Sequence, residues 1–173
     1  MTDITRCPIC LTDLTENAIV LQHKDATRYK CDVCGQFDVS HFTLIDSRFD
    51  SLKPLIRAWI RRQNKLGIPH PHVGANIEGA SIDWFEDLKR MNFPKTVNEK
   101  INALLEAYAD IIKDDYNKII KVNQYPNLIA EIVGKNLEDI IGLNQLLADL
   151  GYIWSVPGHP NVHIRMTAKG WLH

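Results

Sequence analysis

The chain of 173 residues has no long apolar run and no excess of charge of either sign. Its longest apolar runs fall far short of the ~20 residues that a transmembrane helix needs, and no apolar signal segment precedes the first cysteine. Twenty Lys and Arg residues stand against 21 Asp and Glu residues, a net charge of -1. Attraction to nucleic acid or to an acidic membrane therefore needs a local patch. We expect a soluble, cytoplasmic protein.

Motifs for catalysis are also lacking. The sequence contains no glycine-rich phosphate loop, no nucleophile elbow and no metal site with an open position. Most carboxylates fall on faces that the sequence predicts to be exposed to solvent. We therefore expect a protein that is not an enzyme.

Cysteine is scarce, and all of it falls into two CxxC pairs, formed by Cys7, Cys10, Cys31 and Cys34. Each pair can bind one side of a tetrahedral zinc ion, and together they complete a closed four-cysteine shell. A closed shell leaves no position for water or substrate, so we predict one structural Zn²⁺. Two disulfides are the alternative, but a cytosolic chain keeps its thiols reduced. A zinc-braced HNH nuclease would need catalytic histidines between the pairs, where only His23 lies.

Short β-prone runs lie between and after the cysteine pairs, at residues 18–22, 27–30 and 37–40. With Pro8 and Gly35 placed to form the two turns, this pattern predicts a zinc ribbon. In small metal-dependent domains, zinc supplies roughly 10 to 16 kcal/mol of apparent folding free energy. Arg28 and Lys30 could contact phosphate from this ribbon, or could simply offset the negative charge of a zinc ion held by four thiolates.

A basic helix is predicted over residues 51–67, with Ser51 as its N-cap and Gly67 as its terminator. Apolar residues recur at i, i+3, i+4, i+7 and i+8 and form one stripe. A second face carries five cations and no carboxylate, namely Lys53, Arg57, Arg61, Arg62 and Lys65. This face is the best candidate for contacting phosphate. A solvated face, or one that docks on an acidic helix, is the alternative.

A long connection is predicted from residue 68 to residue 79, which contain two prolines and two glycines. Its His70 and His72 lack the third ligand that a metal site needs, so we predict a plain loop. Ser81 is expected to cap a short helix that ends near Phe93.

The clearest helix begins at a capping box of Thr96 and Glu99 and is predicted to end near Asp114. Its apolar face includes Val97. The runs 119–122 and 128–133 fit a strand or a short helix equally well. Asn136 is expected to cap the next helix, 137–150, whose last residue Leu150 is predicted to face inward.

The C-terminal pattern is helix, Gly151, strand 152–156, turn 157–161 and strand 162–166, which is typical of a winged helix-turn-helix. A final helix opens at Thr167 and is cut short at His173, which suggests a domain of a longer protein.

Charge argues against DNA reading by this predicted winged helix. The outward line of its last full helix is expected to be Glu138, Gly142, Gln145 and Asp149, which includes no cation. A helix that enters the major groove normally brings Arg or Lys to the DNA. The wing offers only Arg165. Winged helices also serve as protein-interaction modules, so the fold alone does not assign the function.

The predicted fold is therefore α+β and mostly helical. Residues 1–45 form the zinc ribbon, 46–93 a helical connector with the basic helix, and 94–173 the winged helix-turn-helix.

Five motifs follow one another in a fixed order: CPIC, CDVCG, the Arg-rich helix 57–62, the helix start 94–100 and the closing segment 166–171. It resembles the zinc-ribbon plus winged-helix region at the start of some bacterial proteins whose C-terminal part is a TIR-like or nucleoside deoxyribosyltransferase-like domain. The resemblance implies a sensing or regulatory region, of a kind used in anti-phage defence. It carries over no catalytic residue.

We therefore expect a non-enzymatic regulatory or sensor module that binds a protein partner or an adjoining effector domain. The alternative is a DNA- or RNA-binding regulator. Its phosphate contacts would come from the basic helix, the ribbon and the wing, through Lys53, Arg57, Arg61, Arg62, Lys65, Arg28, Lys30 and Arg165.

Overall fold

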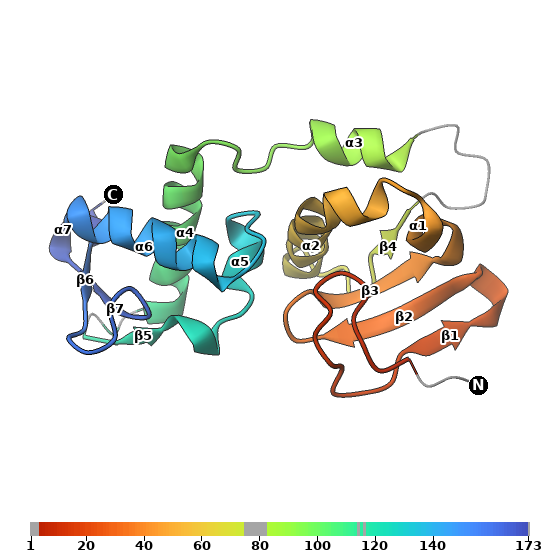
Figure 1. The fold of residues 1–173 in the computed structure, drawn as a ribbon, viewed down its shortest axis with the longest axis horizontal. Coiled ribbons are helices and arrows are strands. Elements are labelled where there is room, and N and C mark those ends of the chain that lie inside the picture. Colours follow the sequence, from red (N-terminus) through yellow and green to blue (C-terminus); the bar gives the residue numbers. More distant parts are fainter. Residues whose placement is uncertain (1–3, 75–82, 114, 116, 173) are drawn as a thin grey trace. The chain divides into compact units, whose positions relative to one another are not determined.

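The protein has an α+β fold with two small sheets (Figure 1). The structure, a computed structural model, describes residues 4–74, 83–113, 115 and 117–172. The chain divides into two compact units, Met1–Phe93 and Pro94–His173. Within the described residues, no helix has the length and apolarity to cross a membrane.

A four-stranded sheet organises the N-terminal unit. Strands β1 (Ile19–Leu21), β2 (Ala26–Cys31) and β3 (Gly35–Ser40) are antiparallel neighbours, and they lie where the sequence predicts them. A short 3₁₀ helix, Gln22–Lys24, forms the first turn. The fourth strand, β4 (His72–Val73), pairs in parallel with β3. The prediction of a plain loop is therefore wrong at His72 and Val73, which pair with β3. Residues 75–79 of the predicted connection lie outside the described residues.

Helices α1 (His41–Ile45) and α2 (Phe49–Lys65) contact β3 (Figure 1). Helix α2 begins at Phe49, so Ser51 lies inside it and is not its N-cap. The reason is that Phe49 is buried and extends the apolar stripe by one more turn. Gly67, with φ of +84°, follows the helix as predicted. Because α2 and β4 both pack with β3, residues 1–45 and 46–93 belong to one unit.

Helix α3 (Trp84–Arg90) follows, and Asp83 is its N-cap, with a side chain that accepts a hydrogen bond from the Phe85 N–H. The predicted cap, Ser81, lies outside the described residues. Trp84 packs edge-on against Trp59 of α2, with ring centroids 5.4 Å apart.

Helices contain more residues of the C-terminal unit than its strands do. They are α4 (Val97–Ile112), α5 (Leu128–Glu131), α6 (Leu137–Asp149) and α7 (Ala168–Trp171). The capping box at Thr96 and the Asn136 cap are both present as predicted. Val97 and Leu150 are 54% and 49% exposed, so neither faces the core as predicted. Both lie at helix ends, beyond the packed turns.

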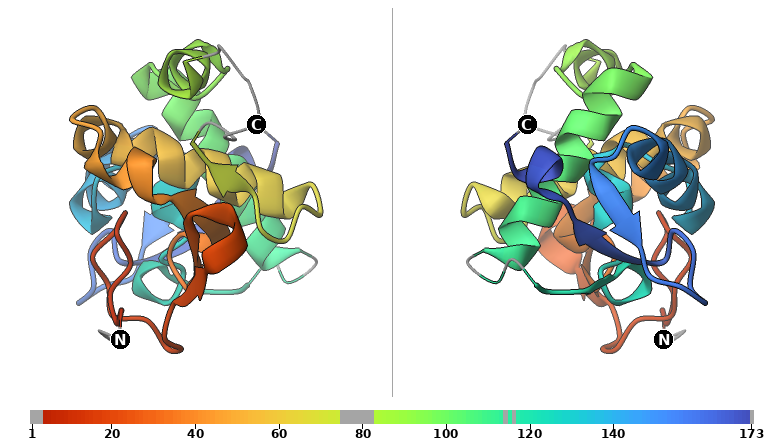
Figure 2. Two further views of the ribbon diagram at one scale, coloured as in Figure 1. Left: turned by 90° about the vertical axis from the view of Figure 1, so that its right-hand side faces the viewer. Right: turned by 90° about the vertical axis from the view of Figure 1, so that its left-hand side faces the viewer.

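The sheet of this unit has the order β5-β7-β6, with antiparallel neighbours. Its strands are β5 (Ile120–Lys121), β6 (Ile153–Ser155) and β7 (His163–Met166), and a 3₁₀ turn, Val122–Gln124, follows β5. The right-hand view of Figure 2 shows β6 and β7 side by side, with α7 next to β7. Side chains from α4, α6 and the inner face of this sheet, including Leu104, Tyr108, Ile140, Leu147 and Ile164, form one core.

Candidate metal centre

All four cysteines converge in the N-terminal unit. Their sulfur atoms lie within 4.8 Å of one another, and all four are free thiols. The Cys7 and Cys34 sulfurs are 3.8 Å apart and those of Cys10 and Cys31 are 3.4 Å apart, too far for disulfides. A tetrahedral zinc ion with Zn–S bonds of about 2.3 Å requires sulfurs about 3.8 Å apart. The four predicted ligands are therefore brought together in a geometry that could hold a metal ion.

Two turns position these sulfurs. Cys31 and Cys34 flank the tight turn between β2 and β3, where Cys31 pairs with Gly35. Gly35 has a φ of +94°, as predicted for the residue that ends this turn. In the other turn, the residue after Cys10 is Leu11, and it adopts a φ of +63°. The Leu11 N–H donates to the Cys7 carbonyl oxygen, which closes the first turn.

The four thiols lie close enough together to shift one another's pKa values. The neighbouring thiols, Cys10 first, together with burial raise the pKa of Cys34 far above its ordinary range. Four thiolates, three of them buried, repel one another unless a metal ion neutralises them. The Thr12 hydroxyl lies 2.7 Å from the Cys10 sulfur and can donate a hydrogen bond to its thiolate. This all-sulfur donor set fits a closed, tetrahedral metal site.

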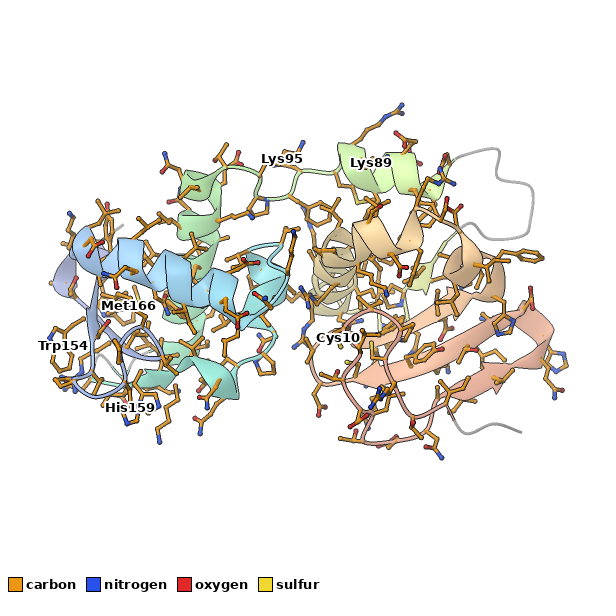
Figure 3. The ribbon with its side chains drawn as sticks, in the orientation of Figure 1. Cys10, Lys89, Lys95, Trp154, His159 and Met166 are labelled. Atoms are coloured by element: carbon orange, nitrogen blue, oxygen red, sulfur yellow. The ribbon has the colours of Figure 1, made fainter. Side chains whose placement is uncertain are left out.

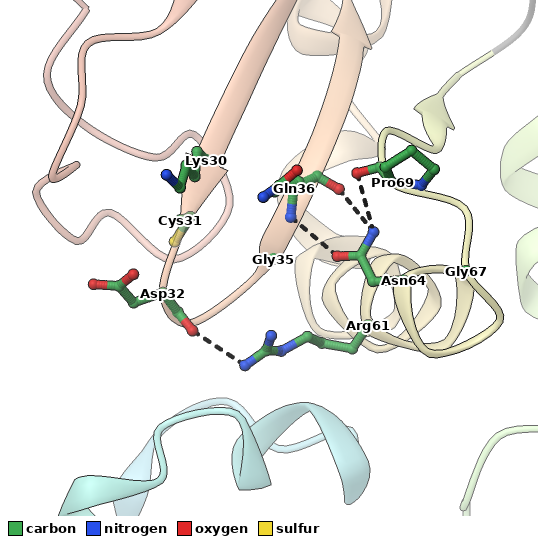
Figure 4. Close-up of a pocket in the computed structure, with 9 residues that line it drawn as sticks. All are labelled: Lys30, Cys31, Asp32, Gly35, Gln36, Arg61, Asn64, Gly67 and Pro69. Atoms are coloured by element: carbon green, nitrogen blue, oxygen red, sulfur yellow. Dashed lines mark hydrogen bonds between the residues drawn. The ribbon is translucent and has the colours of Figure 1, made fainter.

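Helix α2 holds the second cysteine turn through two side chains (Figure 4). Arg61 donates from Nη2 to the Asp32 carbonyl oxygen at 3.1 Å. The Asn64 amide accepts from the Gln36 N–H and donates to the Gln36 carbonyl oxygen, both at 3.0 Å. Asn64 also donates to the Ile68 carbonyl oxygen. This one side chain therefore pairs with β3 as a neighbouring strand would. Sequence reasoning missed Asn64, whose partner on β3 is 28 residues away.

A groove of about 490 Å³ lies between this cysteine turn and the end of α2 (Figure 4). It is lined by Lys30, Cys31, Asp32, Gly35, Gln36, Arg61, Asn64, Gly67 and Pro69. Gly35 has no room for a side chain, because a Cβ there would overlap the Asn64 amide oxygen.

The five cations of the basic helix do not share one exposed face. Arg57 is buried, at 5% exposure, and Arg61 is engaged with Asp32. Lys53 pairs with Asp50 at 2.6 Å, a carboxylate that belongs to the helix because α2 begins at Phe49.

The remaining predicted contact residues are spread over both units. Arg62 and Lys65 lie at the surface of α2, and Arg62 donates to the Asn92 carbonyl oxygen. Arg28 binds the buried carboxylate of Asp38 with two hydrogen bonds, of 2.8 and 3.0 Å. Lys30 pairs with Glu16 at 2.7 Å. Arg165 lies on β7, with its guanidinium 5.9 Å from the centre of the Trp154 ring.

Helix α6 exposes Glu138, Gly142, Gln145 and Asp149, as predicted from the sequence. A chain of hydrogen bonds ties this helix to the β6–β7 hairpin. The Asn161 amide donates to the Gln145 side-chain oxygen, and the Gln145 amide donates to Asp149, both at 2.8 Å.

Deeper in the unit, the buried Asn144 donates to the Asn161 carbonyl oxygen and accepts from the Tyr108 hydroxyl, both at 2.7 Å. Burial raises the pKa of Tyr108, so its hydroxyl remains a donor. We call these bonds, together with those of Gln145, the hairpin network. The network occupies polar groups of α6 that a DNA-reading helix would offer to bases.

Comparisons with known proteins give no relative. No protein-family model, no curated protein and no solved structure matches the chain significantly.

Proposed function

We propose that the protein is a non-enzymatic regulatory or sensor module, braced by one structural Zn²⁺, that binds a protein partner through the exposed face of α6. The partner is a separate protein or an adjoining effector domain, and anti-phage defence is a process in which such a module would serve. The reduced cysteines suit a reducing compartment such as the cytoplasm.

Zinc is the metal that best suits this donor set. Four thiolates in tetrahedral arrangement are typical of structural zinc sites, and they leave no position for substrate. Arg61 and Asn64 connect the cysteine turn to α2, so the metal would hold the sheet and the helix in one body.

The topology of the C-terminal unit supports a winged helix. Its order is helix α4, strand β5, helices α5 and α6, then strands β6 and β7, and β7 lies between the other two strands. In a winged helix-turn-helix that binds DNA, the helix at the place of α6 enters the major groove.

One observation separates α6 from such a recognition helix and carries the proposal. Helix α6 contains three carboxylates and no cation, and the hairpin network occupies Gln145 and Asp149. Its exposed side also offers Leu146 and Leu150, which are four residues apart and 42% and 49% exposed. Carboxylates beside exposed leucines fit a basic, amphipathic segment of a protein and oppose the phosphates of DNA.

The test is to express the tagged protein in its own host and to identify copurifying proteins by mass spectrometry. A partner bound through α6 should be lost when Leu146 is changed to Glu. The matched control is Leu66→Glu, which places the same charge at an exposed leucine of the N-terminal unit. Retention of every partner by Leu146→Glu would contradict the proposal. A gel shift with duplex DNA at low salt that disappears in Leu146→Glu but not in Leu66→Glu would also contradict it.

A further inference from the structure

The outer face of the β5-β7-β6 sheet carries cations and an exposed aromatic ring. The register pairs Trp154 with Arg165 and Lys121 with His163 across neighbouring strands. The residues next to them along the strands, Ile120, Ile153, Ile164 and Met166, are buried in the core. The four paired side chains of Trp154, Arg165, Lys121 and His163 therefore share the opposite, outer face of the sheet. His159 adds a ring whose centroid is 4.2 Å from that of His163. Figure 3 shows Trp154 and His159 on the outside of the hairpin.

No carboxylate is available within these segments to neutralise the cations. Residues 117–130 and 150–172 include no Asp or Glu. Lys121 and Arg165 form no ion pair with any residue that the structure describes, in contrast to Arg28 and Lys30 of the N-terminal unit. The buried Nε of Arg165 also has no hydrogen-bond acceptor among the described residues. The positive charge of this face is therefore open to an external anion.

An aromatic platform lies beside these charges. Trp154 is 48% exposed although it belongs to a strand, where a large apolar ring would normally be buried. Arg165 lies over the ring, an arrangement in which a guanidinium and an indole can both stack on flat groups.

We infer that this sheet face is a binding site for single-stranded nucleic acid. Trp154 would stack on an unpaired base, while Lys121 and Arg165 bind the flanking phosphates. This function goes beyond the partner binding proposed for α6 and uses a different surface of the unit.

Single strands fit this face better than duplexes or acidic peptides do. The bases of a duplex are stacked on one another and have no free face for Trp154, whereas the bases of a single strand do. An acidic peptide would use the cations but would leave the exposed ring without a matching group.

The experiment uses the zinc-loaded full chain and fluorescence anisotropy with labelled dT15 and rU15 at low salt. Both probes carry the same number of phosphates and unpaired pyrimidine bases, and they differ in the 2′-hydroxyl of the sugar and the C5 methyl of thymine. We expect Trp154→Ala to weaken binding about 5- to 150-fold, the range of one base-stacking contact. Trp154→Phe, which keeps an aromatic ring, should retain most of the affinity. We expect Lys121→Gln to lower the slope of log affinity against log salt by about 0.7.

The matched control is Lys95→Gln, which removes one exposed charge from the same unit but away from the sheet (Figure 3). It should leave the affinity within about twofold of wild type and the salt slope unchanged. The inference is overturned if neither probe binds at low salt. It is also overturned if Trp154→Ala and Lys121→Gln bind as the wild type does, or if a polyglutamate peptide displaces dT15 at equal charge concentration. Because Leu146 is unchanged throughout, each of these outcomes leaves the α6 proposal standing.

Discussion

Leu11 and Gly35 follow the second cysteine of their respective turns, and both adopt a positive φ. Glycine accepts this conformation without steric cost, whereas a residue with a Cβ loses roughly 1–2 kcal/mol. We expect Leu11→Gly to raise the unfolding free energy of the zinc-loaded protein by about 1 kcal/mol. The side chain of Leu11 is largely exposed, so little packing is lost. Urea denaturation with excess zinc measures the change.

Gly35→Ala is the matched control for this prediction. It should lower stability, because its Cβ would overlap the Asn64 amide oxygen. Equal or lower stability of Leu11→Gly relative to wild type would mean that the first turn carries no backbone strain.

Asn64 connects α2 to β3 through hydrogen bonds to the backbone of Gln36. Replacement by Leu removes the donors and the acceptor and leaves the Gln36 N–H and carbonyl oxygen without this partner. We expect a loss of about 1–3 kcal/mol in unfolding free energy and weaker zinc binding. Asn64→Asp keeps the acceptor for the Gln36 N–H and should lose less. Urea denaturation and competition with a chromogenic zinc chelator measure both effects. Gln63→Ala is the neighbouring control, and an Asn64→Leu protein as stable as this control would refute the role.

At the residue scale, the sequence predicts that the cysteines come together at one site, but it does not predict the role of Asn64. Four cysteines in two CxxC pairs have a local spacing that the chemistry of zinc explains. Asn64 has no comparable signature, because its function comes from tertiary contacts with Gln36 and Ile68.

Helices and strands differ in how far the sequence alone predicts them. The capping residues Thr96 and Asn136 act on backbone groups three residues away, so their signals are local and both predictions are confirmed. In α2, the helical period is correct, yet Arg57 is buried and the basic face is divided. Strand β4 has two residues and exists through its pairing with β3. The burial of Arg57 and the pairing of β4 depend on contacts with the rest of the fold, and the periodicity of one segment carries no information about those contacts.

The β6–β7 hairpin should respond to pH through His163. Burial first, and then the nearby His159 and Lys121, lower the pKa of His163 below its ordinary value. The unfolded chain then takes up a proton at a higher pH, near 6.5, than the folded hairpin does. Stability should therefore fall as the pH drops through about 6.5, and should level off below the pKa of the folded state.

Hydrogen exchange at pH 7.5 and 5.5, read on residues 153–166, measures this dependence. His163→Asn removes the titrating ring and should flatten the response of the hairpin. His72→Asn is the control, because His72 lies on β4 of the N-terminal unit and burial lowers its pKa in the same direction. An unchanged pH response of the hairpin in His163→Asn would assign the effect to another group.

At the scale of the whole molecule, a net charge of -1 conceals segregated charges. The charged side chains of helix α6 are all carboxylates, whereas Lys121 and Arg165 on the outer face of the β5-β7-β6 sheet are cations. The composition predicts no attraction to nucleic acid. The order of residues shows that 117–130 and 150–172 lack carboxylates, but it does not show that the cations of these two segments share one face. Strand register is what places Lys121 beside His163 and Arg165 beside Trp154.

The two compact units should depend differently on zinc. The sheet of the N-terminal unit is closed at one end by the four cysteines, and zinc supplies roughly 10 to 16 kcal/mol of apparent folding free energy in comparable sites. The C-terminal unit has a continuous apolar core built from α4, α6 and its own sheet, and the part of it that the structure describes holds no cluster of metal-ligating side chains. Removal of zinc by a chelator should therefore unfold the first unit and leave the second folded.

Native mass spectrometry should detect about one zinc ion per chain before the chelator is added, as one tetrahedral four-thiolate site requires. Hydrogen exchange should then show protection lost in β2 and β3 but retained in α4 and α6, and added zinc should restore it. Cys34→Ser should lose the same protection without a chelator, because three thiolates hold the metal less tightly. Simultaneous loss of protection in both units would mean that the C-terminal core is not stable alone, and full protection of β2 and β3 without metal would remove zinc from the fold.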